Sequence, residues 1–128
     1  MIAGVGTDIA AVARMARLFE RYGERVAEKL LSPLEYEDFS KTSNVPRFLA
    51  KRFSAKEALG KALGIGVSPP ATLTAIAITH DALGKPLFAY SEALERYMTE
   101  RGLKAHLSIS DEKEFAVAFV VLEGSQGE

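Results

Sequence analysis

The chain has 128 residues, which is the length of one ordinary domain. Hydrophobic residues make up 48% and charged residues 26%, a mixture that is typical of globular proteins and excludes a disordered or fibrous chain. A formal net charge of −1 argues against bulk electrostatic binding to nucleic acid or anionic membranes, and the absence of cysteine excludes disulfides, thiolate metal sites and cysteine nucleophiles.

The first half of the chain predicts one strand followed by helices. Residues 2–9 are small and β-branched and predict a short buried strand. An amphipathic helix is expected over 11–22, and residues 32–35, with proline in the first helical position, mark the start of another. The longest periodic segment, residues 47–63, predicts a long helix that ends at Gly64.

The second half predicts four more strands and one helix. Residues 73–79 alternate like a strand, and 87–90 form another after a turn. Residues 91–102 are expected to be an amphipathic helix, and 105–110 and 115–122 an antiparallel hairpin. The sum is an α/β (α+β) fold with a sheet of about five strands packed on the long helix.

Domain limits and location can also be predicted. We expect one domain over residues 1–123 and a flexible tail over 124–128. No apolar run approaches the ~20 residues that span a bilayer, and residues 1–4 lack the basic start of a signal peptide. We therefore expect a cytoplasmic protein without a membrane partner.

Two carboxylates and one lysine are the candidate catalytic groups. Asp8 ends an otherwise apolar strand, where it either caps the next helix or binds a ligand. Glu57 and Lys61 are four residues apart on the long helix, which is the spacing of an ordinary surface ion pair. Small residues flank them, however, so a phosphate and a hard cation such as Mg²⁺ could also approach this strip.

Arg52 and Lys56 fall on the apolar arc of the same helix, where a simple amphipathic helix has no charges. Such side chains are usually paired or extend along apolar surface. The alternative is that they reach phosphates from a half-buried floor, because phosphate recognition favours arginine and lysine.

Four motifs in register resemble those of the holo-acyl-carrier-protein synthases, a family of phosphopantetheinyl transferases. They are Gly6-Thr7-Asp8-Ile9, the run from Arg52 to Gly64, Gly84-Lys85-Pro86, and Leu107-Ser108-Ile109-Ser110 followed by Phe115-Ala116-Val117-Ala118. The resemblance covers the chain as far as Glu123 and implies the 4′-phosphopantetheinyl transferase-like fold. It also implies transfer of 4′-phosphopantetheine from coenzyme A to a serine of acyl carrier protein, in fatty acid biosynthesis, with release of 3′,5′-ADP.

The resemblance also implies roles for individual residues. Mg²⁺ would be held by Asp8 and Glu57, and Lys61 would stabilise charge on the transferred phosphate. The residues expected to bind coenzyme A are Arg52, Lys56, Lys61, Gly84, Lys85 and Pro86, the last three near its adenine end. Relatives form homotrimers with active sites at subunit interfaces, which would also explain charges on the apolar arc of the long helix.

The first helix carries a candidate docking surface for the acidic carrier protein. Arg14, Arg17, Arg21 and Arg25 share one arc, and they form either a docking strip or an ordinary solvated face. In the docking interpretation the side chains of Arg14 and Arg21 are expected to point away from Asp8 and Glu57.

One position departs from the family. Many relatives have histidine where this chain has Asp111, so the role of that histidine cannot be transferred. The proton acceptor for the carrier serine is left open between Glu57, a water bound by the metal, and Asp111. His80 and His106 match no site of the family.

Two other functions remain open from the residues alone. One is a different Mg²⁺-dependent phosphotransferase or phosphodiesterase that acts without a carrier protein. The other is a module that binds nucleic acid through the arginine strip, although the charge balance and the lack of interleaved aromatic residues argue against it.

Overall fold

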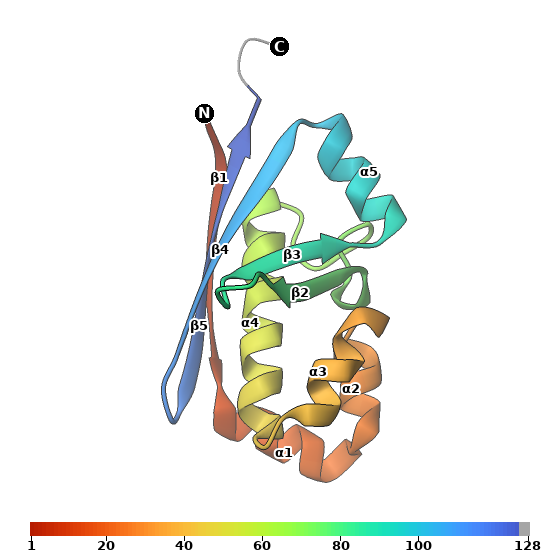
Figure 1. Cartoon of the computed structure of the whole chain (residues 1–128), viewed down its shortest axis with the longest axis vertical. Coiled ribbons are helices and arrows are strands. Elements are labelled where there is room, and N and C mark those ends of the chain that lie inside the picture. The colour runs from red at the N-terminus through yellow and green to blue at the C-terminus, as the bar shows by residue number, and fades with distance from the viewer. Residues whose placement is uncertain (126–128) are drawn as a thin grey trace.

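A three-stranded antiparallel sheet forms one side of the molecule. The structure, a computed structural model, describes residues 1–125. The sheet has the order β1-β5-β4, with β1 over Ile2–Ala11, β4 over Leu103–Asp111 and β5 over Phe115–Gly124. The first and last strands of the chain therefore lie side by side (Figure 1).

Helix α4 (Val45–Leu63) lies along one face of this sheet and forms the centre of the fold (Figure 1). Asn44 caps its amino end by accepting a hydrogen bond from the Arg47 amide (3.1 Å), and Gly64 ends it in the left-handed conformation at φ 80°. The hairpin of β2 (Ile76–His80) and β3 (Pro86–Tyr90) crosses α4, so the helix is covered on two sides.

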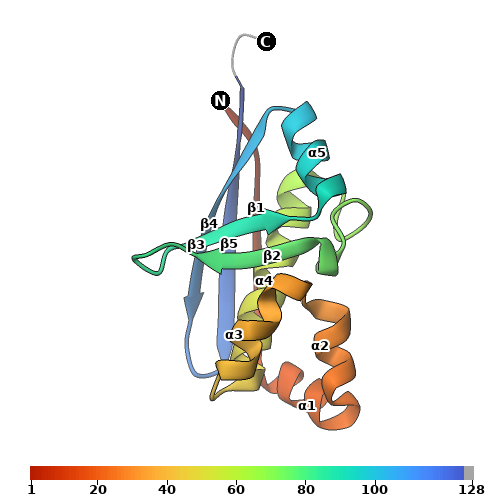
Figure 2. The same ribbon diagram turned by 45° about the vertical axis from the view of Figure 1, so that its right-hand side comes forward.

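The remaining helices lie at the two ends of α4. Helices α1 (Val12–Tyr22), α2 (Glu24–Leu30) and α3 (Tyr36–Lys41) surround its amino-terminal half, whereas α5 (Glu92–Glu100) lies near its carboxyl end (Figure 2). Short 3-10 helices, η1 (Pro33–Glu35) and η2 (Leu73–Ala75), connect the layers. One apolar core lies between α4, the strands and α5, and a second between α4, α1 and α2.

The predicted fold class is confirmed, and three details differ. The five strands are divided between a three-stranded sheet and a separate hairpin. Residues 73–75 form a 3-10 turn, because β2 begins only at Ile76. Gly124, expected to begin the tail, is the last residue of β5, and the Ser125 amide donates to the Gly102 carbonyl (3.0 Å); residues 126–128 of the expected tail lie outside the described residues.

In the part of the chain that the structure describes, no helix is both long enough and apolar enough to cross a membrane.

Candidate active site

Two glycines in β1 bring this strand against the backbone of α4. A Cβ atom on Gly6 would lie 2.7 Å from the Ala62 nitrogen and closer still to the Ala58 carbonyl oxygen, and one on Gly4 would collide with the Ala62 carbonyl. Ala58 and Ala62 are the small residues that face the strand. Because neither side has bulk at this crossing, the next inward residue of β1, Asp8, is brought beside the carboxyl-terminal half of α4.

Asp8 and Lys61, which the family resemblance implies for one active site, lie in contact in the structure. The Lys61 ammonium donates to Asp8 Oδ1 (3.0 Å) and to the Thr7 carbonyl (2.9 Å). Asp8 Oδ2 is buried and has no hydrogen-bond partner. Lys61 uses two of its three donors in these bonds, so one donor and one carboxylate oxygen remain available to a ligand.

Glu57 belongs to the same site. Burial raises the pKa of the Glu57 carboxyl above its ordinary value, and the negative charge of Asp8 raises it further. The positive charges of Lys61 and Arg14 act in the opposite direction. A carboxylate whose pKa is raised by a neighbouring negative charge gains from a cation bound beside it.

The donor set suits a hard divalent cation that is completed by its substrate. Among residues 1–125 no group of three metal-ligating side chains occurs, so the protein alone does not build a closed metal cage. Mg²⁺ is commonly bound by one or two carboxylates together with water and substrate phosphates. The unpartnered Asp8 oxygen beside Glu57 fits that pattern.

Gly60, Ser54 and Gly64 are the small residues that flank Glu57 and Lys61 on α4, and each has a structural role apart from making room for a ligand. Gly60 lacks a side chain because a Cβ there would lie 2.6 Å from the Gly66 carbonyl carbon. Ser54 is buried and donates to the Lys51 carbonyl (3.2 Å). Gly64 ends the helix. The close approach comes instead from the glycines of β1.

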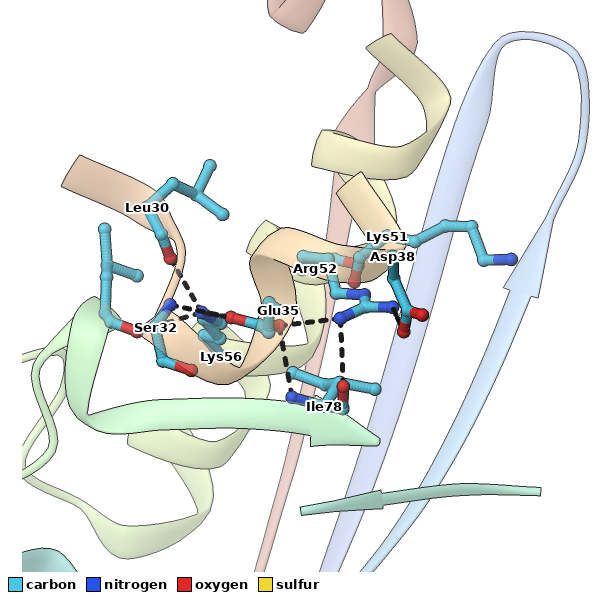
Figure 3. A network of polar contacts seen from close by, with 10 residues as sticks. Leu30, Ser32, Glu35, Asp38, Lys51, Arg52, Lys56 and Ile78 are labelled. Atoms are coloured by element: carbon cyan, nitrogen blue, oxygen red, sulfur yellow. Dashed lines mark hydrogen bonds and ion pairs between the residues drawn. The ribbon is translucent and has the colours of Figure 1, made fainter. Parts of the chain in front are cut away.

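Arg52 and Lys56 are buried in an ion network centred on Glu35 (Figure 3). Arg52 Nη1 donates to Glu35 Oε2 and to the Ile78 carbonyl, both at 2.9 Å, and its Nη2 donates to Asp38 (3.3 Å). Lys56 donates to Glu35 Oε1 (2.6 Å) and to two backbone carbonyls. Both side chains are therefore paired, which is the first of the two interpretations given for them from the sequence. Because Glu35 neutralises them inside the molecule, the charges on the apolar arc of α4 do not require a subunit interface.

Glu35 is the residue that the sequence interpretation missed. It is fully buried, and besides the two cations it accepts hydrogen bonds from the Ser32 and Ile78 amides (2.9 and 3.1 Å). Burial lowers the pKa of Lys56, while the Glu35 charge opposes that shift. The signal was available, because two cations on an apolar helix face require a buried carboxylate, and Glu35 stands in the capping box after Ser32.

A second cluster of cations lies at the amino-terminal half of α4. Arg47, Lys51 and Arg52 line a cavity of about 130 Å³ together with His80. Asp111, at the end of β4, lies 3.5 Å from Arg47 Nε and 3.6 Å from Lys51 Nζ. The Asp111 carboxylate therefore forms ion pairs with Arg47 and Lys51.

The arginine strip is interrupted. Gly23, at φ 59°, ends α1, so Arg25 lies on α2 and does not continue the helix of Arg14, Arg17 and Arg21. All four are exposed. The charge of Arg14 acts to lower the pKa of Glu57, and its guanidinium lies 5.7 Å from the Phe53 ring centroid on α4.

An apolar hollow of about 420 Å³ lies beside these arginines. Its floor is apolar and includes Met15, Leu18, Val26 and Phe53, and basic side chains of α1 and α2 line its edge. Arg14, Arg25 and Lys29 are the basic residues among those that line the hollow, so an apolar depression lies beside positive charge.

Gly84 and Lys85 lie in the turn of the β2–β3 hairpin, and Pro86 is the first residue of β3. The Asp81 carboxylate builds this turn by accepting hydrogen bonds from the Leu83 and Lys85 amides (2.8 and 2.9 Å). These backbone donors lower the pKa of Asp81. The hairpin tip extends from the body of the molecule (Figure 2).

Comparison with known proteins identifies similar chains of known family. Holo-(acyl-carrier-protein) synthase of Dechloromonas aromatica is 60% identical over 123 residues, covering 96% of this chain and 98% of that protein. The crystal structure of the synthase from Neisseria meningitidis superimposes with a TM-score of 0.92 at 44% identity, covering 96% of this chain and 99% of that one. The synthase from Bacillus anthracis, solved in complex with CoA (3′,5′-ADP), has a TM-score of 0.81 at 36% identity, covering 98% and 99%.

The family assignment rests on the same stretch of chain that builds the site. The model of the 4′-phosphopantetheinyl transferase superfamily matches residues 4–120, from the first glycine of β1 to the middle of β5. This chain therefore belongs to the 4′-phosphopantetheinyl transferase superfamily.

Proposed function

We propose that this protein transfers 4′-phosphopantetheine from coenzyme A to a serine of apo-acyl carrier protein, giving holo-acyl carrier protein and 3′,5′-ADP for fatty acid biosynthesis. The observation that carries the proposal is the grouping of Asp8, Glu57 and Lys61 in a chain whose 60% identical relative is a holo-(acyl-carrier-protein) synthase. That relationship favours transfer to a carrier over the phosphodiesterase and nucleic-acid alternatives.

Asp8 and Glu57 are the residues that would hold Mg²⁺. When bound between them and the coenzyme pyrophosphate, the ion would supply charge neutralisation and a template for the phosphate oxygens. Lys61 adds a fixed positive charge at the same place, because Asp8 and Thr7 hold its ammonium and leave one donor for a phosphate oxygen.

The carrier serine loses its proton as its oxygen bonds to the phosphorus nearer the pantetheine and the bond to 3′,5′-ADP breaks. Of the two protein groups considered as proton acceptors, Glu57 lies beside Asp8 in the candidate site, whereas Asp111 is paired with Arg47 and Lys51. We therefore assign proton acceptance to Glu57, directly or through a water molecule.

Coenzyme A binding is assigned to Lys61 and to the Gly84–Pro86 turn, whose exposed backbone and Lys85 side chain suit the adenine end. We do not assign Lys56 to coenzyme A, because its ammonium is fully buried and donates hydrogen bonds to Glu35 and to two backbone carbonyls. Arg52 is retained only as a lining residue of the cavity beside His80, since Glu35, Asp38 and Ile78 already accept its hydrogen bonds.

Acyl carrier protein is proposed to dock on α1 and the start of α2. Carrier proteins are acidic, and Arg14 and Arg25 line the apolar hollow together with Lys29, while Arg17 and Arg21 are exposed on the same helix as Arg14. These arginines would guide the encounter, and an apolar side chain of the carrier would fill the hollow.

Homotrimer formation is proposed from the outer face of the sheet. Val5, Ile9, Phe115, Val117 and Phe119 are all 38–62% exposed there, on two neighbouring strands. An apolar face of this kind marks an interface. Phe119→Asp should dissociate the assembly in sedimentation velocity, whereas Leu34→Asp, at an exposed residue of η1 outside the sheet, should not; a dissociated wild-type protein with full activity would refute the trimer.

One experiment tests the function itself. The protein is incubated with coenzyme A, Mg²⁺ and an apo-acyl carrier protein, and the carrier is weighed by mass spectrometry. Phosphopantetheine addition is expected with the native carrier and not with a carrier whose acceptor serine is alanine. Consumption of coenzyme A without carrier modification would instead support the phosphodiesterase alternative. The cytoplasmic location stays a prediction.

A further inference from the structure

We propose that Asp111 is an internal anion that occupies a phosphomonoester site formed by Arg47 and Lys51, and that it weakens binding of the 3′-phosphorylated nucleotide by competing for these cations. The inference rests on the proposed function, because that function makes coenzyme A and 3′,5′-ADP the ligands. In this proposal Asp111 sets the affinity for the nucleotide and does not accept the proton of the carrier serine.

The cations of this site are only partly neutralised. Arg47 and Lys51 face a single carboxylate, and both ion-pair distances, 3.5 and 3.6 Å, are longer than a normal charge-assisted hydrogen bond of about 2.7–2.9 Å. Arg47 Nε is buried and donates no hydrogen bond. Asp111 thus holds the cations loosely, and one buried donor is left for another acceptor.

The surroundings favour an anion with more charge than a carboxylate. The site lies at the amino end of the 19-residue helix α4, where the helix dipole adds positive potential. Lys51 extends away from the Glu35 network toward the β4–β5 hairpin (Figure 3). His80 lines the same cavity, and burial together with the Arg52 charge lowers its pKa, so it is a neutral hydrogen-bonding group there.

A phosphomonoester carries a charge of about −1.5 to −2 at neutral pH and three acceptor oxygens. It is therefore a stronger ligand for two adjacent cations than the single charge of Asp111. The cavity of about 130 Å³ between α4 and β2 gives such a group room to enter. Entry displaces Asp111 toward solvent, and this displacement lowers the net affinity.

The pair 3′,5′-ADP and 5′-AMP isolates the effect, because the two nucleotides differ only in the 3′-phosphate. Isothermal titration calorimetry of each, without carrier protein, is expected to show Asp111→Asn binding 3′,5′-ADP about threefold more tightly, since exposed ion pairs are worth up to ~1 kcal/mol. Arg47→Gln and Lys51→Gln should each weaken 3′,5′-ADP about tenfold. Binding of 5′-AMP should not change in any of them.

Two variants control for charge and for fold. Glu112→Gln removes the same charge one residue away and should leave both affinities at the wild-type value, and Asp111→Glu, which keeps the competing carboxylate, should bind 3′,5′-ADP like wild type. Unchanged or weaker binding of 3′,5′-ADP by Asp111→Asn overturns the proposal, and so does an equal change for 5′-AMP. Wild-type transfer in the mass-spectrometric assay together with such a result would refute this inference while leaving the proposed function intact.

Discussion

Replacing Gly6 with alanine should move Asp8, which lies on β1, away from Glu57 and Lys61, which lie on α4. The added Cβ would lie 2.7 Å from the Ala62 nitrogen, against the roughly 3.5 Å of a relaxed contact, and closer to the Ala58 carbonyl. Because both obstructing groups are backbone atoms of a helix, no side chain can rotate out of the way. The strand must move by nearly an ångström relative to α4, and Asp8 moves with it.

The cost should appear in two measurements. Overpacking of this kind costs about 1–3 kcal/mol in the free energy of unfolding, which urea denaturation measures. A displacement of about 1 Å in a catalytic group can reduce turnover ~100-fold, so the mass-spectrometric transfer rate should fall by at least tenfold. The loss of rate should persist at temperatures where the variant is fully folded.

Gly124→Ala is the matched control. A Cβ at Gly124 would meet the Ala3 Cβ at 3.4 Å, which is ordinary contact. Its stability should be unchanged or raised by up to about 1 kcal/mol, because alanine restricts the unfolded chain, and its transfer rate should stay at the wild-type value. A Gly6→Ala protein with normal stability and turnover would refute the claim that glycine is required at this crossing.

Three further predictions concern the site, the network and the docking surface. Asp8→Asn and Glu57→Gln should each lower the transfer rate at saturating Mg²⁺ at least 100-fold with little change in the unfolding midpoint; near-normal turnover in either would exclude the metal assignment. Glu35→Gln should cost about 3–5 kcal/mol in urea denaturation, because it leaves two buried cations without their carboxylate. Asp38→Asn, at the half-exposed end of the same network, should cost under ~1 kcal/mol, and equal losses would contradict the central role of Glu35. Arg21→Glu should raise the steady-state KM for the carrier protein about fivefold at low salt and leave that for coenzyme A unchanged; a loss that does not diminish at high ionic strength would argue against electrostatic docking.

The sequence predicts most elements of this fold because their signals are local. The end of α4 at Gly64, the Ser91 cap of α5 and the β4–β5 hairpin each depend on a few neighbouring residues, and each is found in the structure. The division of the strands into two sheets was not predictable, because strand pairing is set by tertiary packing. The same holds for the 3-10 turn before β2.

For the candidate site, the sequence predicts which residues belong to the site better than it predicts which residues they contact. Asp8 and Lys61 were expected together and lie 3.0 Å apart. For Arg52 and Lys56 the helical pattern left ion pairing and phosphate binding open, and the resemblance to the family favoured coenzyme A; Glu35, the carboxylate buried between them, was not named as their partner. Asp111 was one of three candidates for the proton acceptor, and its pairing with Arg47 and Lys51 was not predicted, since its contacts to α4 exist only after the sheet has packed on the helix.

The pairing of β1 with β5 has a consequence for synthesis on the ribosome. Strand β1 is at the edge of the sheet, and its ladder partner, Phe115–Gly124, comes after the other helices and strands in chain order. Asp8 is therefore made before Lys61 but has no sheet to hold it against Lys61 until β5 has been made. Such long-range closure is slow relative to helix formation. The growing polypeptide can form α4 and its neighbouring helices early, while the pairing of Asp8 with Lys61 is supported by the sheet only after β5 has emerged.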